Sequence, residues 1–478
     1  MILSATSNPT TVRRPATIVR TRWILWRRVV ALFAGLLAAS AAFAGAESPI
    51  AGARDEGTRR FPDIVLLSVD TLRYDRLSLH GYARPTSPAI DALLGAGVRF
   101  DQARVVEPLT APSMASILTS LHPHEHGASR NGLGVRPGLP SLPRMLAARG
   151  YRTGAFVGNW TLRDEMVRLG DHFDDYSEVF SRKRWLGLFY SEATADDLNR
   201  EALEWAREHI GAERRWPFFL WVHYVEPHEP YRYWDDLAPR LGRLDPQDDS
   251  DRYDTEVAFV DRAIGSLLSD LQTLVPRDEL LVIFVSDHGE SLGEHDYWGH
   301  GRNLFDPGLR VPMGLTWHGR LRPAVLDTPA SSLDLTPTIL GLLGLDVPDA
   351  LRGHDWSPML RGEAAAPADR VTWHQAHKGA VQRRGNERAR RQGLLAVARV
   401  GGDEKVVLDL RDQTLRRFEL GDDPGELRGQ SAANTEAEDA LQTWLEAVQR
   451  GLAASDELPP PSLDEEDLEQ LRALGYID

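Results

Sequence analysis

Residues 279–290 read ELLVIFVSDHGE, an uninterrupted apolar run that ends in a polar cluster. Such a run is typical of a strand that is buried on both faces of a parallel sheet. Residues 63–70, DIVLLSVD, and residues 217–225, PFFLWVHYV, repeat the pattern. Functional side chains gather at the carboxyl ends of such strands, so these three endings predict where a site lies.

Helical and strand patterns alternate outward from these runs. The sequence predicts helices at 86–97, 112–121, 139–149, 255–274 and 333–345, and further strands at 98–106, 151–157 and 309–317. This alternation predicts an α/β fold, a doubly wound and mostly parallel sheet with helices on both faces. After about residue 365, short strands at 393–400, 405–410 and 415–420 predict a small antiparallel C-terminal subdomain.

The N-terminus has the pattern of a secretory signal. Six arginines precede the first acidic residue, residues 29–43 are apolar and small, and Ala42-Phe43-Ala44 is an A-x-A cleavage site. The apolar run is shorter than the roughly 20 residues of a membrane span, although an uncleaved anchor is the alternative. We therefore expect an exported protein, periplasmic or extracellular, that meets a membrane only through an uncleaved N-terminal segment.

We divide the chain into five parts on these patterns. They are a signal peptide at 1–46, a polar linker at 47–60, a catalytic domain at 61–364, a C-terminal subdomain at 365–430, and a helical and acidic tail at 431–478.

The composition excludes several classes of function. The 478 residues are 42% hydrophobic and 26% charged, as in an ordinary globular protein, and contain no cysteine. Disulfides, zinc–thiolate sites, iron–sulfur clusters and thiol nucleophiles are therefore excluded. The formal net charge of −15, or −21 without the six arginines, argues against a nucleic-acid partner. An anionic substrate needs a locally positive site, most simply a metal ion.

Asp70, Asp287 and His288 follow two of the predicted strands. Carboxylate oxygens and neutral imidazole are the ligands that a hard or borderline metal ion takes. An Asp after a strand is also a common helix cap or turn residue. Thr110 precedes a predicted helix, where it is either the N-cap or a nucleophile in the positive field of the helix end.

Seven segments carry a family resemblance over most of the chain from about Asp63. They read IVLLSVDTLRYDRL, YARPTSPAIDALLGAGVRFDQA, APSMASILTSLHPHEHG, HYVEPHEPY, VSDHGESLGEHDYWGHG, LRVPM and FELGDDPGELRG. The chain resembles the sulfatase family of the alkaline-phosphatase superfamily. The resemblance implies an alkaline-phosphatase-like fold and a metal held near the strand ends, with a nucleophile at the head of a helix.

Matching positions imply roles for individual residues. Asp70, Asp287 and His288 resemble metal ligands, and Thr110 takes the nucleophile position, where it would also touch the metal. His228 resembles the group that contacts the ester or leaving group, and His300 falls where many relatives carry a lysine near the ester oxygens. The candidates for substrate contact are Arg130, His223 and His126, the two histidines being equally well explained by packing or loop roles. Glu290, Glu294 and His295 are either supports of the site or solvated loop residues.

The departures from the family pattern bear on the chemistry. Sulfatases carry C-x-P-x-R or S-x-P-x-R, whose Cys or Ser becomes formylglycine, whereas residues 110–114 here read TAPSM. Threonine cannot give that aldehyde, so no formylglycine is expected. Thr71 replaces the second Asp of the usual metal pair. Attack by Thr110 would give a sulfo- or phospho-threonine ester that water or an acceptor must cleave.

Three functions follow from these residues. The first is an exported, metal-dependent hydrolase of a sulfate or phosphate ester, acting on a small anionic ester or a surface glycan or lipid. The second is a phosphotransferase resembling lipoteichoic-acid synthase, and the third is a non-catalytic binding relative. The resemblance implies Ca²⁺, whereas the imidazole of His288 favours Zn²⁺ or Mn²⁺. A second metal near His228 or His300 stays open, and so does the oligomeric state.

Overall fold

The computed structural model describes residues 61–181, 191–210, 216–379, 393–431 and 436–455. The predicted signal peptide, the linker at 47–60, the basic segment at 383–391 and the end of the tail lie outside these residues. None of the helices in the described part of the chain combines the length and the apolar character that a membrane span needs.

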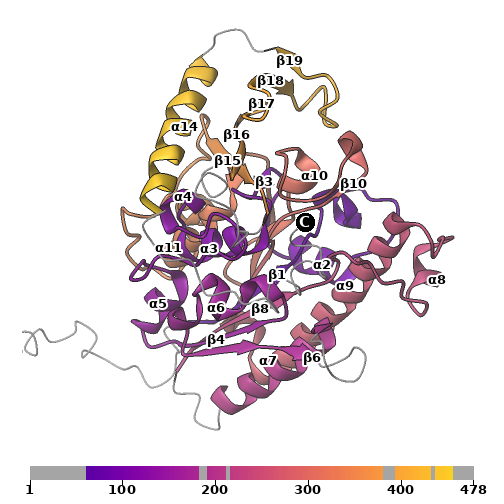
Figure 1. The fold of residues 1–478 in the computed structure, drawn as a ribbon. Coiled ribbons are helices and arrows are strands. Elements are labelled where there is room, and N and C mark those ends of the chain that lie inside the picture. The colour runs from indigo at the N-terminus through magenta and orange to yellow at the C-terminus, as the bar shows by residue number, and fades with distance from the viewer. Residues whose placement is uncertain (1–60, 182–190, 211–215, 380–392, 432–435, 456–478) are drawn as a thin grey trace, which may run out of the picture. The chain divides into compact units, whose positions relative to one another are not determined.

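An eight-stranded sheet forms the centre of the described structure (Figure 1). Its strands, in spatial order, are β13 (Ala324–Leu326), β2 (Val98–Phe100), β12 (Met313–Trp317), β9 (Leu280–Ser286), β1 (Asp63–Val69), β8 (Phe218–Tyr224), β4 (Arg152–Val157) and β5 (Asp175–Glu178). Only β12 runs antiparallel to its neighbours, β9 and β2. The predicted mostly parallel α/β sheet is therefore confirmed.

Helices cover both faces of this sheet. They are α2 (Pro88–Gly95), α3 (Thr110–Thr119), α4 (Pro123–His126), α5 (Leu142–Ala147), α6 (Asp164–Val167), α7 (Ala195–Ile210), α8 (Ala238–Leu241), α9 (Asp249–Leu274), α10 (Asp306–Leu309), α11 (Leu335–Leu342) and α12 (Ser357–Leu360). Short strand pairs join β10 (Ser291–Leu292) to β11 (Trp298–Gly299), β3 (Ala103–Arg104) to β14 (Ala330–Ser331), and β6 (Phe180–Ser181) to β7 (Ser191–Glu192).

Alternation along each central strand builds two separate cores. Val65 and Leu67 of β1 pack in the cluster that contains α2, α7 and α9, whereas Ile64 and Leu66 pack with α3, α5 and α11. Successive side chains of a strand point to opposite faces, so a strand that is apolar at every position is sealed on both. All seven residues of β1, β8 and β9 are buried.

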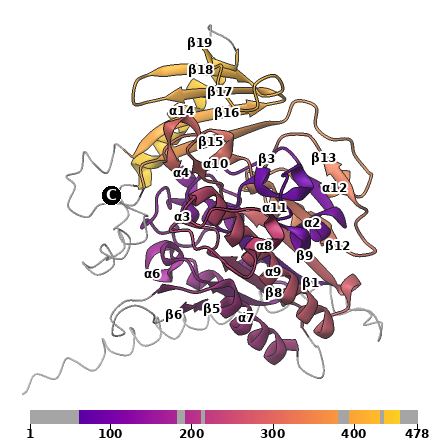
Figure 2. The same ribbon diagram turned by 90° about the vertical axis from the view of Figure 1, so that its right-hand side faces the viewer.

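The C-terminal region forms a second, antiparallel sheet. Its strands are β15 (Val371–His377), β16 (Leu394–Gly401), β17 (Glu404–Asp409), β18 (Thr414–Glu419) and β19 (Gln430–Ser431). Figure 2 shows these strands, in orange to yellow, above the labels of β1, β8 and β9. Helix α14 (Glu436–Ser455) packs on this sheet through Ala437, Leu441 and Leu445. Three of these strands were predicted, whereas β15 and β19 were missed.

Two predicted elements differ from the structure. The expected strand at 98–106 is two short strands, β2 and β3, in different sheets. The helix expected from Pro112 begins at Thr110, so Pro112 is its third residue. Proline is tolerated there because the first-turn N–H groups have no partner inside the helix.

Candidate active site

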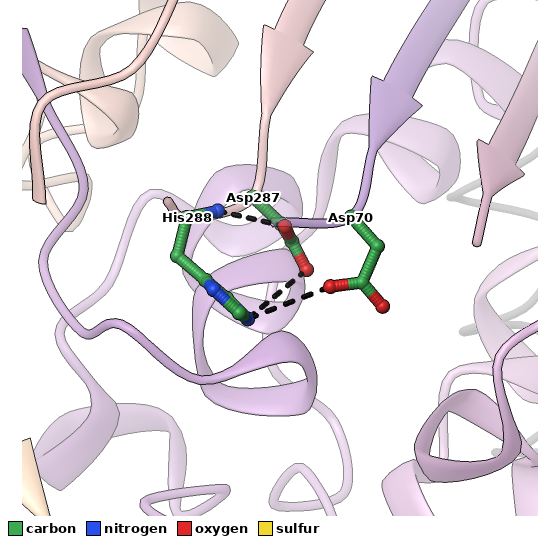
Figure 3. A group of neighbouring side chains, drawn as sticks. All are labelled: Asp70, Asp287 and His288. Carbon is green, nitrogen blue, oxygen red and sulfur yellow. Dashed lines mark hydrogen bonds and ion pairs between the residues drawn. The ribbon is translucent and has the colours of Figure 1, made fainter. Parts of the chain in front are cut away.

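The parallel register of β1 and β9 brings the two predicted carboxylates together. Val69 is the register partner of Ser286, so the next residues, Asp70 and Asp287, leave the sheet side by side. The Asp287 N–H donates to the carbonyl of Val69 at 3.2 Å. Asp70, Asp287 and His288 are all fully buried, and Figure 3 shows their side chains converging beyond the strand ends.

The ligand atoms of these three residues converge on one point. His288 Nε2 lies 3.6 Å from Asp70 Oδ1 and 3.7 Å from Asp287 Oδ2, and the three residues each offer one atom within 4.8 Å of the others. Within the described residues, Asp70 Oδ1 and Asp287 Oδ2 are buried with no hydrogen-bond partner. Two unpartnered carboxylate oxygens facing an imidazole nitrogen fit a divalent cation.

Neighbouring bonds select which atom each ligand presents. Asp287 Oδ1 accepts from the N–H groups of Thr71 and His288, at 3.2 and 2.7 Å, which leaves Oδ2 for the cluster. His288 Nδ1 lies 2.9 Å from the carbonyl of Gly289, so Nδ1 donates and Nε2 keeps its lone pair. Thr71 adopts a left-handed backbone with φ +53°, an uncommon conformation for a β-branched residue.

Burial sets the electrostatics of the cluster. Burial and the charge of Asp70 raise the pKa of Asp287 well above its usual value. Burial, followed by the neighbouring His300, lowers the pKa of His288 to about 3, which keeps the imidazole neutral and able to bind a metal. Burial alone would raise the pKa of Asp70, but the charge of His228 and the interaction with His223 outweigh it and lower that pKa. A cation would relieve the repulsion at Asp287.

Thr110 lies beside this cluster at the head of α3. Its Oγ1 is 3.3 Å from His288 Nε2. The N-cap interpretation of Thr110 is wrong, because Leu109 takes that position and Thr110 is already helical. Asn131 Oδ1 accepts from the Ala111 N–H at 3.1 Å, and Ser113 Oγ donates to the carbonyl of Asp287 at 2.5 Å. These bonds hold the helix end against the strand end.

Two further predicted histidines adjoin the cluster. The ring of His300 lies 4.5 Å from that of His288 and 5.2 Å from that of His228, measured between centroids. His228 Nδ1 is 2.6 Å from the carbonyl of Glu229. The structure therefore brings together all six predicted catalytic and metal residues, and His288 is the neighbour shared by most of them.

His223 lies between Ser68 and Asp70. Trp221 Nε1 donates to Ser68 Oγ at 2.8 Å, and Ser68 Oγ lies 2.9 Å from His223 Nδ1. The opposite ring nitrogen of His223, Nε2, lies 3.8 Å from Asp70 Oδ2. This arrangement favours orientation of Asp70 over the substrate contact that the sequence suggested.

The other two substrate-contact candidates pack within the fold. His126 Nε2 lies 2.9 Å from Ser116 Oγ, and its Nδ1 accepts from the Ala128 N–H at 3.1 Å. Both ring nitrogens are engaged, which favours the packing role. Arg130 is buried with its guanidinium against Gly393, where an added Cβ would lie 3.0 Å from the guanidinium carbon.

Sequence reasoning missed Asn159. Its side-chain N–H donates to Asp70 Oδ2, and its Oδ1 accepts from the Thr161 N–H at 2.7 Å. Asn159 follows β4, the strand next to β8, so the carboxyl-end argument applied to the predicted strand at 151–157 would have found it.

Comparisons with known proteins agree with this geometry. The family model described as Sulfatase matches residues 62–345. Arylsulfatase A of Homo sapiens is 29% identical over 381 residues, which cover 68% of this chain and 72% of that protein.

Two solved structures share the fold. The crystal structure of Ps i-CgsB in complex with k-i-k-neocarrahexaose has a TM-score of 0.67 at 21% identity, covering 87% of this chain and 97% of that one. Phosphonate monoester hydrolase of Agrobacterium radiobacter has a TM-score of 0.62 at 21% identity, covering 82% and 96%. The family assignment favours an enzyme over a non-catalytic relative. This chain belongs to the sulfatase family of hydrolases.

Proposed function

We propose that the chain is an exported, metal-dependent hydrolase that cleaves a sulfate or phosphate ester through Thr110. The observation that carries the proposal is the 3.3 Å separation of Thr110 Oγ1 from His288 Nε2, beside two buried carboxylate oxygens with no described partner. A bound divalent cation would polarise the ester oxygens and lower the pKa of the Thr110 hydroxyl. Asp70, Asp287, His288 and Thr110 would hold it.

The protein groups around Thr110 suit an attack by its oxygen. The positive end of the ten-residue helix α3 favours developing negative charge on Oγ1. As Oγ1 bonds to sulfur or phosphorus, the bond to the leaving-group oxygen breaks. His228 and His300 lie beside the cluster, where they would contact the ester and leaving-group oxygens.

The metal and the substrate are the finer parts of the proposal. Family resemblance favours Ca²⁺, and the nitrogen ligand His288 favours Zn²⁺ or Mn²⁺. The sulfuric-ester name of arylsulfatase A and the phosphonate-ester name of the fold relative leave both elements as candidates. The first step leaves an ester on Thr110, which water must cleave in a second displacement. This scheme of two displacements suits phosphorus well. The substrate is a small anionic ester or a surface glycan or lipid.

Metal analysis with a paired assay tests this function. The purified full chain is assayed for metal content and incubated with an aryl sulfate, a phosphate monoester and a phosphate diester. We expect about one metal per chain and turnover of at least one ester, which identifies the element attacked. Export is tested separately, by sequencing the N-terminus of the protein secreted from its host. Absence of bound metal together with turnover unaffected by a chelator would reject the metal-dependent scheme.

A further inference from the structure

A buried carboxylate connects His300 to the body of the protein. Glu290 is fully buried, and its Oε1 lies 3.0 Å from His300 Nδ1. Its other oxygen, Oε2, accepts a hydrogen bond from the hydroxyl of Tyr231. Each carboxylate oxygen therefore has one partner, and the three side chains form a continuous chain from Tyr231 to His300.

The loop that carries Glu290 is fixed at both ends. Arg73 donates from its guanidinium to the carbonyl of Glu290 at 3.1 Å and to Glu294 at 2.7 Å. Beyond the hairpin of β10 and β11, the Tyr297 hydroxyl donates to the carbonyl of His300 at 2.6 Å. The residues on both sides of the His300–Glu290 bond are thus held by contacts of their own.

Tyr231 is a reliable donor to this carboxylate. Burial and the negative charge of Glu290 raise the pKa of Tyr231 far above its usual value, so the hydroxyl keeps its hydrogen. A carboxylate only accepts hydrogen bonds, so the hydrogen in the bond to His300 belongs to Nδ1. With Nδ1 directed at the carboxylate, Nε2 is the ring nitrogen left to face the reacting groups. The orientation is that of a histidine base held by an acidic residue.

The ring of His300 adjoins the residue that contacts the nucleophile. His300 packs 4.5 Å from the ring of His288, whose Nε2 lies 3.3 Å from Thr110 Oγ1. His228 is the other histidine at this position, but its Nδ1 bonds a neutral backbone carbonyl. A carboxylate stabilises the imidazolium that forms on proton uptake more than a carbonyl does. These contacts favour His300 as the base and leave His228 for the leaving group.

We propose that Glu290, held by Tyr231, positions His300 as the general base that cleaves the ester formed on Thr110. This role rests on the proposed function, because it concerns its second step. Water bonds to sulfur or phosphorus while His300 Nε2 takes one of its protons. The bond from sulfur or phosphorus to Thr110 Oγ1 breaks with its electron pair on Oγ1. The proton then passes from His300 to Oγ1, and sulfate or phosphate leaves.

The two steps make different demands on the site. Formation of the threonine ester needs Thr110 and the leaving group, whereas its cleavage needs an activated water. Glu290 and Tyr231 are positioning residues that never touch substrate, and His300 is the catalytic residue. Removing the positioning carboxylate should therefore slow the second step more than the first and cause the Thr110 ester to accumulate.

Rapid-mixing kinetics with Glu290→Gln test the role. The full chain is mixed with whichever nitrophenyl sulfate or phosphate it turns over, then quenched in acid for mass analysis of the peptide that contains Thr110. We expect a rapid first release of nitrophenol, close to one per enzyme, followed by steady-state turnover reduced about 10–100-fold. The peptide should carry one sulfate or phosphate group. Tyr231→Phe should show the same pattern with a smaller reduction of steady-state turnover. It replaces Glu290→Gln as the test if that variant folds poorly.

The control is Glu256→Gln, which changes a different buried glutamate that lies on α9. Burial raises the pKa of Glu256 well above its usual value, so the neutral amide is close in shape and charge to the acid it replaces. We expect wild-type kinetics from it. Equal slowing of both steps in Glu290→Gln without an adduct, or unchanged steady-state turnover, would overturn the role of Glu290. Failure of the proposed function looks different, since Thr110→Ala would then stay active.

Discussion

Two buried carboxylates in this molecule, Asp306 and Asp287, reach opposite electrostatic outcomes, and each lies in a cluster of charged groups. In the cluster around Asp306, Arg104 Nη2 lies 2.6 Å from one carboxylate oxygen, and Lys405 Nζ lies 2.9 Å from the other and 2.6 Å from Glu426. In the cluster around Asp287, the neighbours are Asp70 and neutral imidazole. Burial acts on both, yet the pKa of Asp306 is lowered and that of Asp287 is raised.

The presence of cations in one cluster and their absence from the described residues of the other distinguish a structural role from a candidate functional role. Burying a carboxylate is costly unless a cation accompanies it. The cluster around Asp306 includes its own cations, and it joins the C-terminal sheet, through Lys405, to helix α10. The cluster around Asp287 includes none among the described residues, so under the proposed function its cation would come from outside. The following four predictions test this contrast, from the largest expected effect to the smallest.

Thr110→Ala should reduce turnover by at least about 10⁴-fold, because it removes the proposed nucleophile while Asp70, Asp287 and His288 remain to hold the metal. The measurement is the steady-state rate on the ester identified above, with metal content determined on the same sample. Thr110→Ser is the matched control and should retain measurable turnover, since the hydroxyl remains. Turnover within tenfold of wild type in the alanine variant would show that the nucleophile is another group.

Metal removal should lower the stability of the wild type more than it lowers the stability of the Asp287→Asn variant. Without a cation, the charge of Asp287 is repelled by Asp70, and the amide removes that repulsion. A ligand at 1,000 times its dissociation constant contributes about 4.1 kcal/mol to stability, so a chelator should lower the melting temperature of wild type by several degrees. The metal-free variant should melt above metal-free wild type in a thermal denaturation series. Equal melting temperatures with and without chelator would argue that the cluster holds no ion.

Lys405→Met should lower the free energy of unfolding by about 3–5 kcal/mol, whether or not a chelator is present. The substitution leaves Asp306 and Glu426 buried with one cation fewer. Urea denaturation measures the loss. Arg411→Met, which breaks the exposed pair with Asp409, is the control and should cost less than about 1 kcal/mol. A loss from Lys405→Met no larger than this would remove the contrast between the two clusters.

Asp261 offers a third, intermediate case. Its carboxylate accepts from the N–H groups of Ala89 and Ile90, at 2.9 and 2.8 Å. Burial outweighs these bonds and raises its pKa to about 7. The unfolded chain then releases this proton at lower pH than the folded protein, so stability should fall as pH rises from about 4 to 7.

Asp261→Asn should remove this loss, which amounts to about 2–4 kcal/mol across that range. The measurement is urea denaturation of both proteins at several pH values. Below pH 4 the two proteins should be equally stable, because Asp261 is protonated in both the folded and the unfolded state. Parallel stability curves across the whole range would show that the backbone donors hold Asp261 ionised.

The sequence predicts the central strands and the convergence of Asp70, Asp287 and His288. An apolar run such as 279–286 is constrained by burial on both faces, and parallel strands share one carboxyl edge. The supports of the site were harder to foresee. The bonds from Tyr231 to Glu290 and from Ser68 to His223 join positions far apart in the chain, and only the packed fold brings them together.

Local rules also misplaced some residues. Proline is common at the first helical position, which put the start of α3 at Pro112, yet any position of the first turn tolerates it. His126 lies within a segment of family resemblance, and of its two expected roles the bonds of its ring nitrogens to Ser116 and Ala128 favour packing. The residue type shows which partners a histidine can bind, whereas the surrounding fold determines which of those partners are within reach.

The left-handed backbone of Thr71 has a consequence for engineering this enzyme. A buried β-branched residue in that conformation costs about 1–3 kcal/mol, and its N–H orients Asp287. Selection for thermal stability alone should therefore favour glycine or asparagine at position 71, where the strain is relieved. Such variants would tolerate heat better and position Asp287 less rigidly. Stability and activity are expected to trade against each other at this one residue.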